Sequence, residues 1–144
     1  MVHGDYGLHN CIATAEGRIG AVVDWEISTL GDPRADLAYA INAWEEAGDP
    51  AAIRPEAAST APGFPKRADL LACYAETAGR ELSDIGFYRA FNHWKTACIL
   101  DGVVARYDAG QKSTEGVDVQ ALRDRRDRSV TNASNTAATF GFGG

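Results

Sequence analysis

Two short apolar segments and the turn between them dominate the start of the chain. Residues 11–13 are apolar, residues 19–23 are apolar except for one glycine, and residues 15–18 have the composition of a turn. This pattern predicts a β-hairpin. If its strands pair, Asp24 at the end of the second strand returns to the side of Asn10, at the entrance of the first.

Apolar residues farther along the chain recur at the three- and four-residue spacing of helices. The predicted helices cover residues 33–44, 66–79, 84–109 and, with a weaker pattern, 118–130. Asp32 and Ser83 are the expected N-caps of the first and third helices, and Gly79 is the expected stop of the second. The apolar stripe of the third helix is broad, so we expect that helix to be central and mostly buried.

The remaining segments are predicted to be irregular. Residues 45–65 hold four of the five prolines and form a long loop, whereas residues 131–144 are rich in Asn, Ser, Thr and Gly and form a flexible tail. The predicted fold class is mainly α (α+β), with one small hairpin and about four helices. We expect one domain over residues 1–130, with a helical part from residue 32 onward.

Composition and charge narrow the classes of protein to which the chain can belong. The formal net charge is −6 and no basic stripe is present, which argues against a nucleic-acid partner. No run of about 18 apolar residues occurs and no signal peptide precedes His3, so we expect no membrane partner and a cytoplasmic location. Cys11, Cys73 and Cys98 are scattered, and we expect them to be reduced and mostly buried thiols.

The residues around the predicted hairpin carry the candidate chemistry. Asp5, Asn10 and Asp24 would meet at one end of it, and two carboxylates with an amide oxygen are ligands that suit Mg²⁺. Phosphoryl transfer requires such a set, with one acid as the base and one acid and one amide for the metal. The spacing His-x-Asp-x-x-x-x-Asn, followed by an acid at a strand end, is also the spacing of the kinase catalytic loop.

Three motifs taken together resemble the aminoglycoside phosphotransferase and choline kinase superfamily. Residues 3–10 (HGDYGLHN) resemble its catalytic loop, residues 24–26 (DWE) resemble its metal-binding element, and residues 31–38 (GDPRADLA) resemble the segment that follows. The resemblance covers roughly residues 1–110 and is nearest to the branch linked to acyl-CoA dehydrogenases.

The resemblance implies a role for each of five residues. Asp5 would be the catalytic base, and Asn10 and Asp24 would bind Mg²⁺, with ATP as the phosphoryl donor. His3 and Asp36 would support the catalytic loop, with Asp36 turned inward to accept hydrogen bonds from the backbone of that loop. Without the resemblance, Asp36 would only favour the dipole of its helix from the first turn.

A complete member of this superfamily also has an N-terminal lobe, with a nucleotide-covering loop, a strand lysine and a helical glutamate. The chain starts at the catalytic loop and contains neither Gly-x-Gly-x-x-Gly nor a Walker loop. We therefore expect the C-terminal lobe of a protein-kinase-like fold: a fragment, a truncated reading frame or a deliberately shortened chain, inactive alone. Its exposed hairpin surface would meet the N-terminal lobe or a second copy of the chain.

The residues leave two other functions open. A metal-dependent phosphoesterase would use His3, Asp5, His9 and Asp24, but a two-metal site needs further His and Asp motifs. A non-catalytic remnant that binds a partner is the other alternative. For a kinase, the acceptor is a small molecule with a hydroxyl group, and the dehydrogenase-linked branch favours a hydroxylated acyl chain or a similar metabolite. His93, in the third predicted helix, is expected to be a satisfied polar edge.

Overall fold

The computed structural model describes residues 1–54 and 57–140 of the chain. The described part is mainly helical, with one two-stranded hairpin, and this confirms the predicted fold class. Its elements, in chain order, are η1 (Leu8–Asn10), β1 (Cys11–Ala13), β2 (Ile19–Val22), α1 (Arg34–Ala43), η2 (Ala58–Thr60), α2 (Arg67–Ala78), α3 (Ile85–Asp108) and α4 (Val119–Thr139), where η marks a 3-10 helix.

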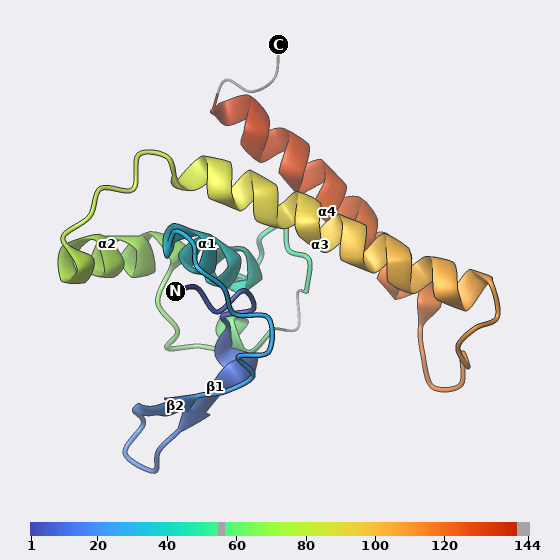
Figure 1. Ribbon diagram of the computed structural model, residues 1–144, viewed down its shortest axis with the longest axis horizontal. Coiled ribbons are helices and arrows are strands. Elements are labelled where there is room, and N and C mark those ends of the chain that lie inside the picture. Colours follow the sequence, from blue (N-terminus) through green and yellow to red (C-terminus); the bar gives the residue numbers. More distant parts are fainter. Residues whose placement is uncertain (55–56, 141–144) are drawn as a thin grey trace.

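The long helix α3 is the centre of the arrangement. It packs against α4 along one side and against α1 on another, and Figure 1 shows α1 beneath the N-terminal half of α3. The hairpin projects from the helical body on the side of the N-terminus. The core is built from small and aliphatic side chains, namely Val2, Ala38, Ile41, Ala52, Ile53, Ala97, Leu100 and Val104.

The hairpin forms where the apolar pattern predicts it. Strands β1 and β2 are antiparallel, with Cys11 opposite Val22, and the second strand ends one residue earlier than expected. The pairing continues beyond the strands, because the backbone N–H of Val23 donates to the carbonyl of Asn10 at 2.9 Å. This register pairs Asn10 with Val23, so Asp24, the next residue, lies at the same end of the hairpin as Asn10, as the sequence pattern predicts.

One predicted helix boundary holds and two are displaced by one residue. Asp32 accepts a hydrogen bond from the backbone of Arg34 at 2.9 Å, but the N-cap of α1 is Pro33 and the helix begins at Arg34, one residue later than predicted. Gly79 ends α2 in the left-handed region at a φ of 59°. Ser83 is not the N-cap of α3; that position belongs to Asp84, and a turn that closes from the N–H of Ile85 to the carbonyl of Leu82 leads into the helix.

The expectation that α3 is mostly buried is wrong for one of its faces. Phe87, Phe91 and Trp94 are 47–57% exposed, whereas Ala97 and Leu100 are buried. The reason is that α1 and α4 cover the face that carries the smaller side chains and leave the aromatic face open. The cysteines also differ from the prediction, since Cys73 and Cys98 are exposed and Cys11 is half-buried.

The flexible tail predicted from residue 131 is instead helical as far as Thr139, because α4 continues along α3. The side-chain amide of Asn132 donates to the carbonyl of Ala51 at 2.9 Å, and the Phe140 ring packs on Gly86 at the start of α3. Residues 141–144 lie outside the described residues. None of the helices in the described part of the chain combines the length and apolar character that crossing a bilayer requires.

Candidate active site

His3 links the catalytic loop to the hairpin. Its side chain is almost fully buried, and its ring lies 4.6 Å from the ring of Trp25. The ring nitrogen Nδ1 accepts from the backbone N–H of Asp5 at 3.3 Å, and Nε2 donates to the carbonyl of Val23 at 2.8 Å. Because a carbonyl can only accept, these two bonds fix the tautomer with the proton on Nε2. Both nitrogens are occupied by backbone groups, so His3 supports the loop and has no lone pair for a metal.

Asp36 is turned inward from the first turn of α1 and holds the backbone of the catalytic loop. Its two oxygens accept from the N–H of His3 at 2.6 Å and from the N–H of Gly4 at 2.8 Å. On the other side of the loop, Lys95 of α3 donates to the carbonyl of Gly4 at 2.9 Å. Gly4 has a φ of 86°, in the left-handed region that favours glycine. Two helices therefore fix the loop immediately before Asp5.

The carboxylate of Asp5 is surrounded by hydrogen-bond donors. The amide of Asn10 and the ring nitrogen Nε2 of His9 both lie 3.3 Å from its Oδ2 atom, and the hydroxyl of Tyr39 also donates to it. Burial raises the pKa of Asp5, but the hydrogen bonds from Tyr39, His9 and Asn10 outweigh burial and lower it below the ordinary value. Asp5 is therefore an ionised, oriented carboxylate at neutral pH.

Asn10 and Asp24 lie at the end of the hairpin nearest the catalytic loop. The Asn10 side chain is buried, and its amide nitrogen also donates to the backbone carbonyl of Asp5 at 2.9 Å. Its amide oxygen makes no hydrogen bond within residues 1–54 and 57–140. The carboxylate of Asp24 is exposed and likewise has no hydrogen bond or ion pair among the described residues.

The backbone of Asp24 is strained. Its φ is 66°, and among the described residues no other residue except glycine has a positive φ. A non-glycine residue in this region costs of order 1–3 kcal/mol, and such residues concentrate at functional sites. The donor set fits Mg²⁺, since one carboxylate and one amide oxygen leave several positions for water and phosphate. In the described part of the chain, no three His, Cys, Asp or Glu side chains are arranged to hold a metal ion.

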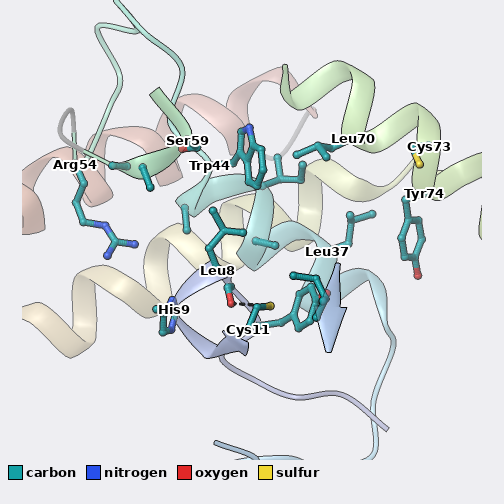
Figure 2. A pocket seen from close by; sticks show the side chains of 18 of the residues that line it. Leu8, His9, Cys11, Leu37, Trp44, Arg54, Ser59, Leu70, Cys73 and Tyr74 are labelled. Carbon is teal, nitrogen blue, oxygen red and sulfur yellow. Dashed lines mark hydrogen bonds between the residues drawn. The ribbon is translucent and has the colours of Figure 1, made fainter. Parts of the chain in front are cut away.

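Two cavities adjoin the catalytic loop. A largely apolar cavity of about 790 Å³ lies between the start of the hairpin, α1, α2 and the loop near Arg54. Figure 2 shows Trp44, Leu70 and Tyr74 around it, with Arg54 and His9 on one side. A smaller polar cavity of about 240 Å³ has Asp5 in its wall. His9, Ala43 and Arg54 line both cavities, so the two spaces are neighbours.

His93 lines the polar cavity, and its environment differs from the prediction. We expected a polar side chain at the helix edge with its hydrogen bonds satisfied, but the side chain is buried and its Nδ1 atom has no hydrogen-bond partner among the described residues. Burial, together with the positive charges of Arg89 and Arg67, lowers the pKa of His93 to about 4. The imidazole is therefore neutral at physiological pH, and it faces a space that polar groups of water or of a ligand can fill.

The loop that borders both cavities is anchored by Glu45, a residue that the sequence pattern does not single out. Glu45 is almost fully buried, and its Oε1 atom accepts from the backbone N–H groups of Ile53 at 2.8 Å and Arg54 at 3.0 Å. Arg67 of α2 completes the set at 3.1 Å from Oε2. The long loop thus has a defined conformation where it meets the cavities.

Tyr39 and Lys95 are two further site residues that the sequence patterns did not indicate. Tyr39 lies three residues after Asp36 and therefore on the same face of α1, a signal that the sequence did contain. Lys95 comes from α3, far along the chain from the catalytic loop, so no local sequence pattern indicates its contact with Gly4.

The phosphoesterase alternative loses support. Both ring nitrogens of His3 are hydrogen-bonded to backbone groups, and His9 is hydrogen-bonded to Asp5.

Comparison with known proteins gives a consistent picture. Residues 1–70 match the model of the phosphotransferase enzyme family. The chain is 36% identical over 118 residues to acyl-CoA dehydrogenase family member 10 of Mus musculus, covering 79% of the chain and 11% of that protein. It is 34% identical over 124 residues to family member 11 of Gallus gallus, covering 80% and 16%. No solved structure shows a significant match.

The human family member 11 is 33% identical over 118 residues, which cover 80% of the chain and 15% of that protein. The chain therefore spans between 11% and 16% of the length of these three relatives.

Proposed function

The chain belongs, through residues 1–70, to the phosphotransferase enzyme family, and on that premise we propose that it is the C-terminal catalytic half of a kinase-like enzyme. The proposed reaction is transfer of the γ-phosphoryl group of Mg–ATP to a hydroxyl group of a small molecule. One observation carries the proposal. Asn10 binds Asp5 through its amide nitrogen and pairs through its backbone carbonyl with Val23, the residue before Asp24. Its amide oxygen, which has no hydrogen bond among the described residues, and the Asp24 carboxylate therefore belong to neighbouring positions at one end of the hairpin.

In this proposal Asp5 orients the acceptor hydroxyl. The acceptor oxygen attacks the γ-phosphorus, the bond from that phosphorus to the bridging oxygen of ADP breaks, and the hydroxyl proton passes to the Asp5 carboxylate. Hydrogen bonds to the Asp5 carboxylate lower its pKa, so the carboxylate is a weak base. It takes the proton late, after the bond that forms between the acceptor oxygen and the γ-phosphorus has made the hydroxyl proton acidic. Mg²⁺ held by Asn10 and Asp24 would neutralise charge on the nucleotide phosphates.

The cavities favour an acceptor that is partly apolar. The larger cavity begins beside Leu8 and His9, close to Asp5, and offers about 790 Å³ of mainly apolar space. An acceptor with a hydroxyl near Asp5 and a hydrocarbon portion in this space would be buried in the manner of other small-molecule sites. A hydroxylated acyl chain or similar metabolite has this character, and the names of the relatives, acyl-CoA dehydrogenase family members, support that choice.

We also propose that these 144 residues do not turn over ATP alone. The sequence contains no glycine-rich phosphate loop, and neither described strand carries a lysine. Phosphoryl transfer depends on groups that hold the phosphates in line and exclude water. Side chains on the hairpin are open for an additional lobe to cover, since Ile12, Ile19 and Trp25 are 44–54% exposed. Self-association through this hairpin surface is the alternative.

The metal site can be tested on the isolated chain with Mn²⁺, which accepts the same oxygen ligands as Mg²⁺ and broadens nearby NMR signals. We expect the signals of Asn10 and Asp24 to broaden first and Mg²⁺ to reverse the effect. Asp24→Ala should abolish this pattern, whereas the control Glu26→Ala, an exposed acid two residues away, should leave it intact. Broadening that is centred elsewhere, or that persists in Asp24→Ala, would refute the proposed site.

A phosphate-release assay with Mg–ATP and candidate alcohols tests the proposed inactivity. We expect no multiple turnovers from the purified chain. Multiple turnovers that disappear in Asp24→Ala would show that the 144 residues are sufficient for catalysis.

A further inference from the structure

The carboxylate of Asp5 is held by a residue from outside its own loop. Tyr39 of α1, one turn after Asp36, lines the polar cavity together with Asp5, and a hydrogen bond from its hydroxyl lowers the pKa of the Asp5 carboxyl. Asp36 itself binds the backbone N–H groups of His3 and Gly4. One face of α1 therefore fixes both the backbone of the catalytic loop and its acidic side chain. The His9 and Asn10 contacts come from the same loop, so they cannot orient Asp5 relative to the helices.

Lys95 joins this arrangement from α3. Its ammonium group lies 5.3 Å from the centre of the Tyr39 ring, within the range of a cation–π interaction, and donates to the Gly4 carbonyl at 2.9 Å. The side chain of Lys95 thus touches both the residue that holds the Asp5 carboxylate and the residue that precedes Asp5. Tyr39 and Lys95 together form what we call the α1–α3 clamp.

The hydrogen bond from Tyr39 to Asp5 does not depend on pH in the physiological range. Burial, followed by the hydrogen bond and charge of Asp5, raises the pKa of Tyr39 above its ordinary value. The hydroxyl therefore keeps its proton throughout the physiological range and remains a donor to Asp5. A donor that also gave up its proton at neutral pH would repel the carboxylate.

We propose that Tyr39 and Lys95 are positioning residues for Asp5, which aim its carboxylate at the polar cavity and couple the catalytic loop to α1 and α3. The proposal deepens the proposed function, because the orientation of Asp5 matters for catalysis only if Asp5 contacts the acceptor. The effect is a matter of geometry: a carboxylate that can rotate away from the acceptor spends less time in a productive pose.

The experiment is a measurement of the Asp5 pKa in the 144-residue chain by ¹³C NMR of its carboxyl group. Tyr39→Phe removes only the hydroxyl, and we expect the pKa of Asp5 to rise because one donor is lost. The titratable groups that face Asp5 in the same cavity must be followed in the same titration; they are His9, Tyr39, Glu45, Arg54, His93 and Arg125.

The chain contains a matched control pair at the far end of α3. Lys112 lies over the Tyr107 ring at 5.8 Å, in the same type of contact but without a link to the loop. Tyr107→Phe and Lys112→Met should leave the Asp5 pKa and the Gly4 carbonyl signal unchanged. Lys95→Met should shift the Gly4 carbonyl signal, and it tests the clamp independently if Tyr39→Phe does not fold.

Two outcomes separate this inference from the proposed function. An Asp5 pKa that is the same in Tyr39→Phe as in the parent, with a Gly4 signal unmoved by Lys95→Met, overturns the clamp whatever reaction the protein catalyses. In an active relative, the counterpart of Tyr39→Phe should lower kcat about 10-fold with little change in the KM for the acceptor, and should move the acid limb of the pH profile to higher pH. An unchanged kcat and pH profile there would overturn the positioning role.

Discussion

Removal of the Asp36 side chain should lower the free energy of unfolding more than removal of any other carboxylate in the first turn of a helix. In Asp36→Ala, the backbone N–H groups of His3 and Gly4 both lose their acceptor. Hydrogen bonds to a charged group contribute about 1.5–3 kcal/mol each, and a buried donor that is left unpaired costs about as much. The N–H of His3 belongs to a buried residue, whereas water can reach Gly4 in part.

The expected loss is therefore about 2–4 kcal/mol of unfolding free energy. Unfolding entropy of about 2.1 cal/mol/K per residue gives about 300 cal/mol/K for 144 residues, so each kcal/mol lowers Tm by about 3 °C. The melting temperature of Asp36→Ala should fall by about 7–13 °C.

Asp69→Ala is the matched control for this measurement. Asp69 also lies in the first turn of a helix, α2, but accepts only a local and exposed hydrogen bond from the N–H of Lys66 at 3.1 Å. Its loss should cost about 1 kcal/mol or less, which is the value of a cap and a favourable helix dipole. Thermal and urea unfolding followed by circular dichroism measure both variants. If Asp36→Ala is no more destabilised than Asp69→Ala, Asp36 acts only on the helix dipole and the reasoning is refuted.

The remaining predictions concern pH and helix packing. Because the folded-state pKa of His93 is about 4 and the unfolded value is about 6.5, the unfolded state binds the proton first, and stability should fall by about 3 kcal/mol as pH drops from 6.5 to 4. His93→Gln should remove this slope in urea unfolding at several pH values; an unchanged slope would contradict the assignment. Gly102→Ala should stabilise α3 by about 0.5–1 kcal/mol, whereas Gly86→Ala should not, because its Cβ would meet the Phe140 ring at 1.7 Å. Equal gains for both, measured by thermal melts, would show that Phe140 does not pack on Gly86.

The hairpin could be predicted from the sequence because its interactions are local. Turn composition and two apolar strands fix the register, and the register pairs Val23 with Asn10, which brings Asp24 to the same end of the hairpin as Asn10. The start of α1 follows in the same way from Asp32 and the proline after it. Asp36 was placed by the resemblance of its motif and not by helical periodicity, which accounts equally well for an exposed carboxylate.

Features that depend on packing between distant segments could not be predicted. Phe87, Phe91 and Trp94 are as apolar as the residues that α3 buries, and only the positions of α1 and α4 decide which face is covered. The end of α4 has many Thr, Asn and Ser residues with poor helix propensity, and packing against α3 outweighs that propensity. Lys95 reaches Gly4 across 91 positions of sequence, and no local pattern records such a contact.

The most direct test of the central claim is to separate the roles of Asp5 and Asp24 in a longer relative, such as acyl-CoA dehydrogenase family member 10 of Mus musculus. The counterpart of Asp5→Asn should lower the turnover of phosphoryl transfer by about 10²–10⁴-fold and leave Mg–nucleotide binding, measured by calorimetry, nearly intact. The counterpart of Asp24→Ala should weaken Mg–nucleotide binding itself, whereas that of Glu26→Ala should change neither quantity. Turnover that survives unchanged in either the Asp5 or the Asp24 variant would contradict the account.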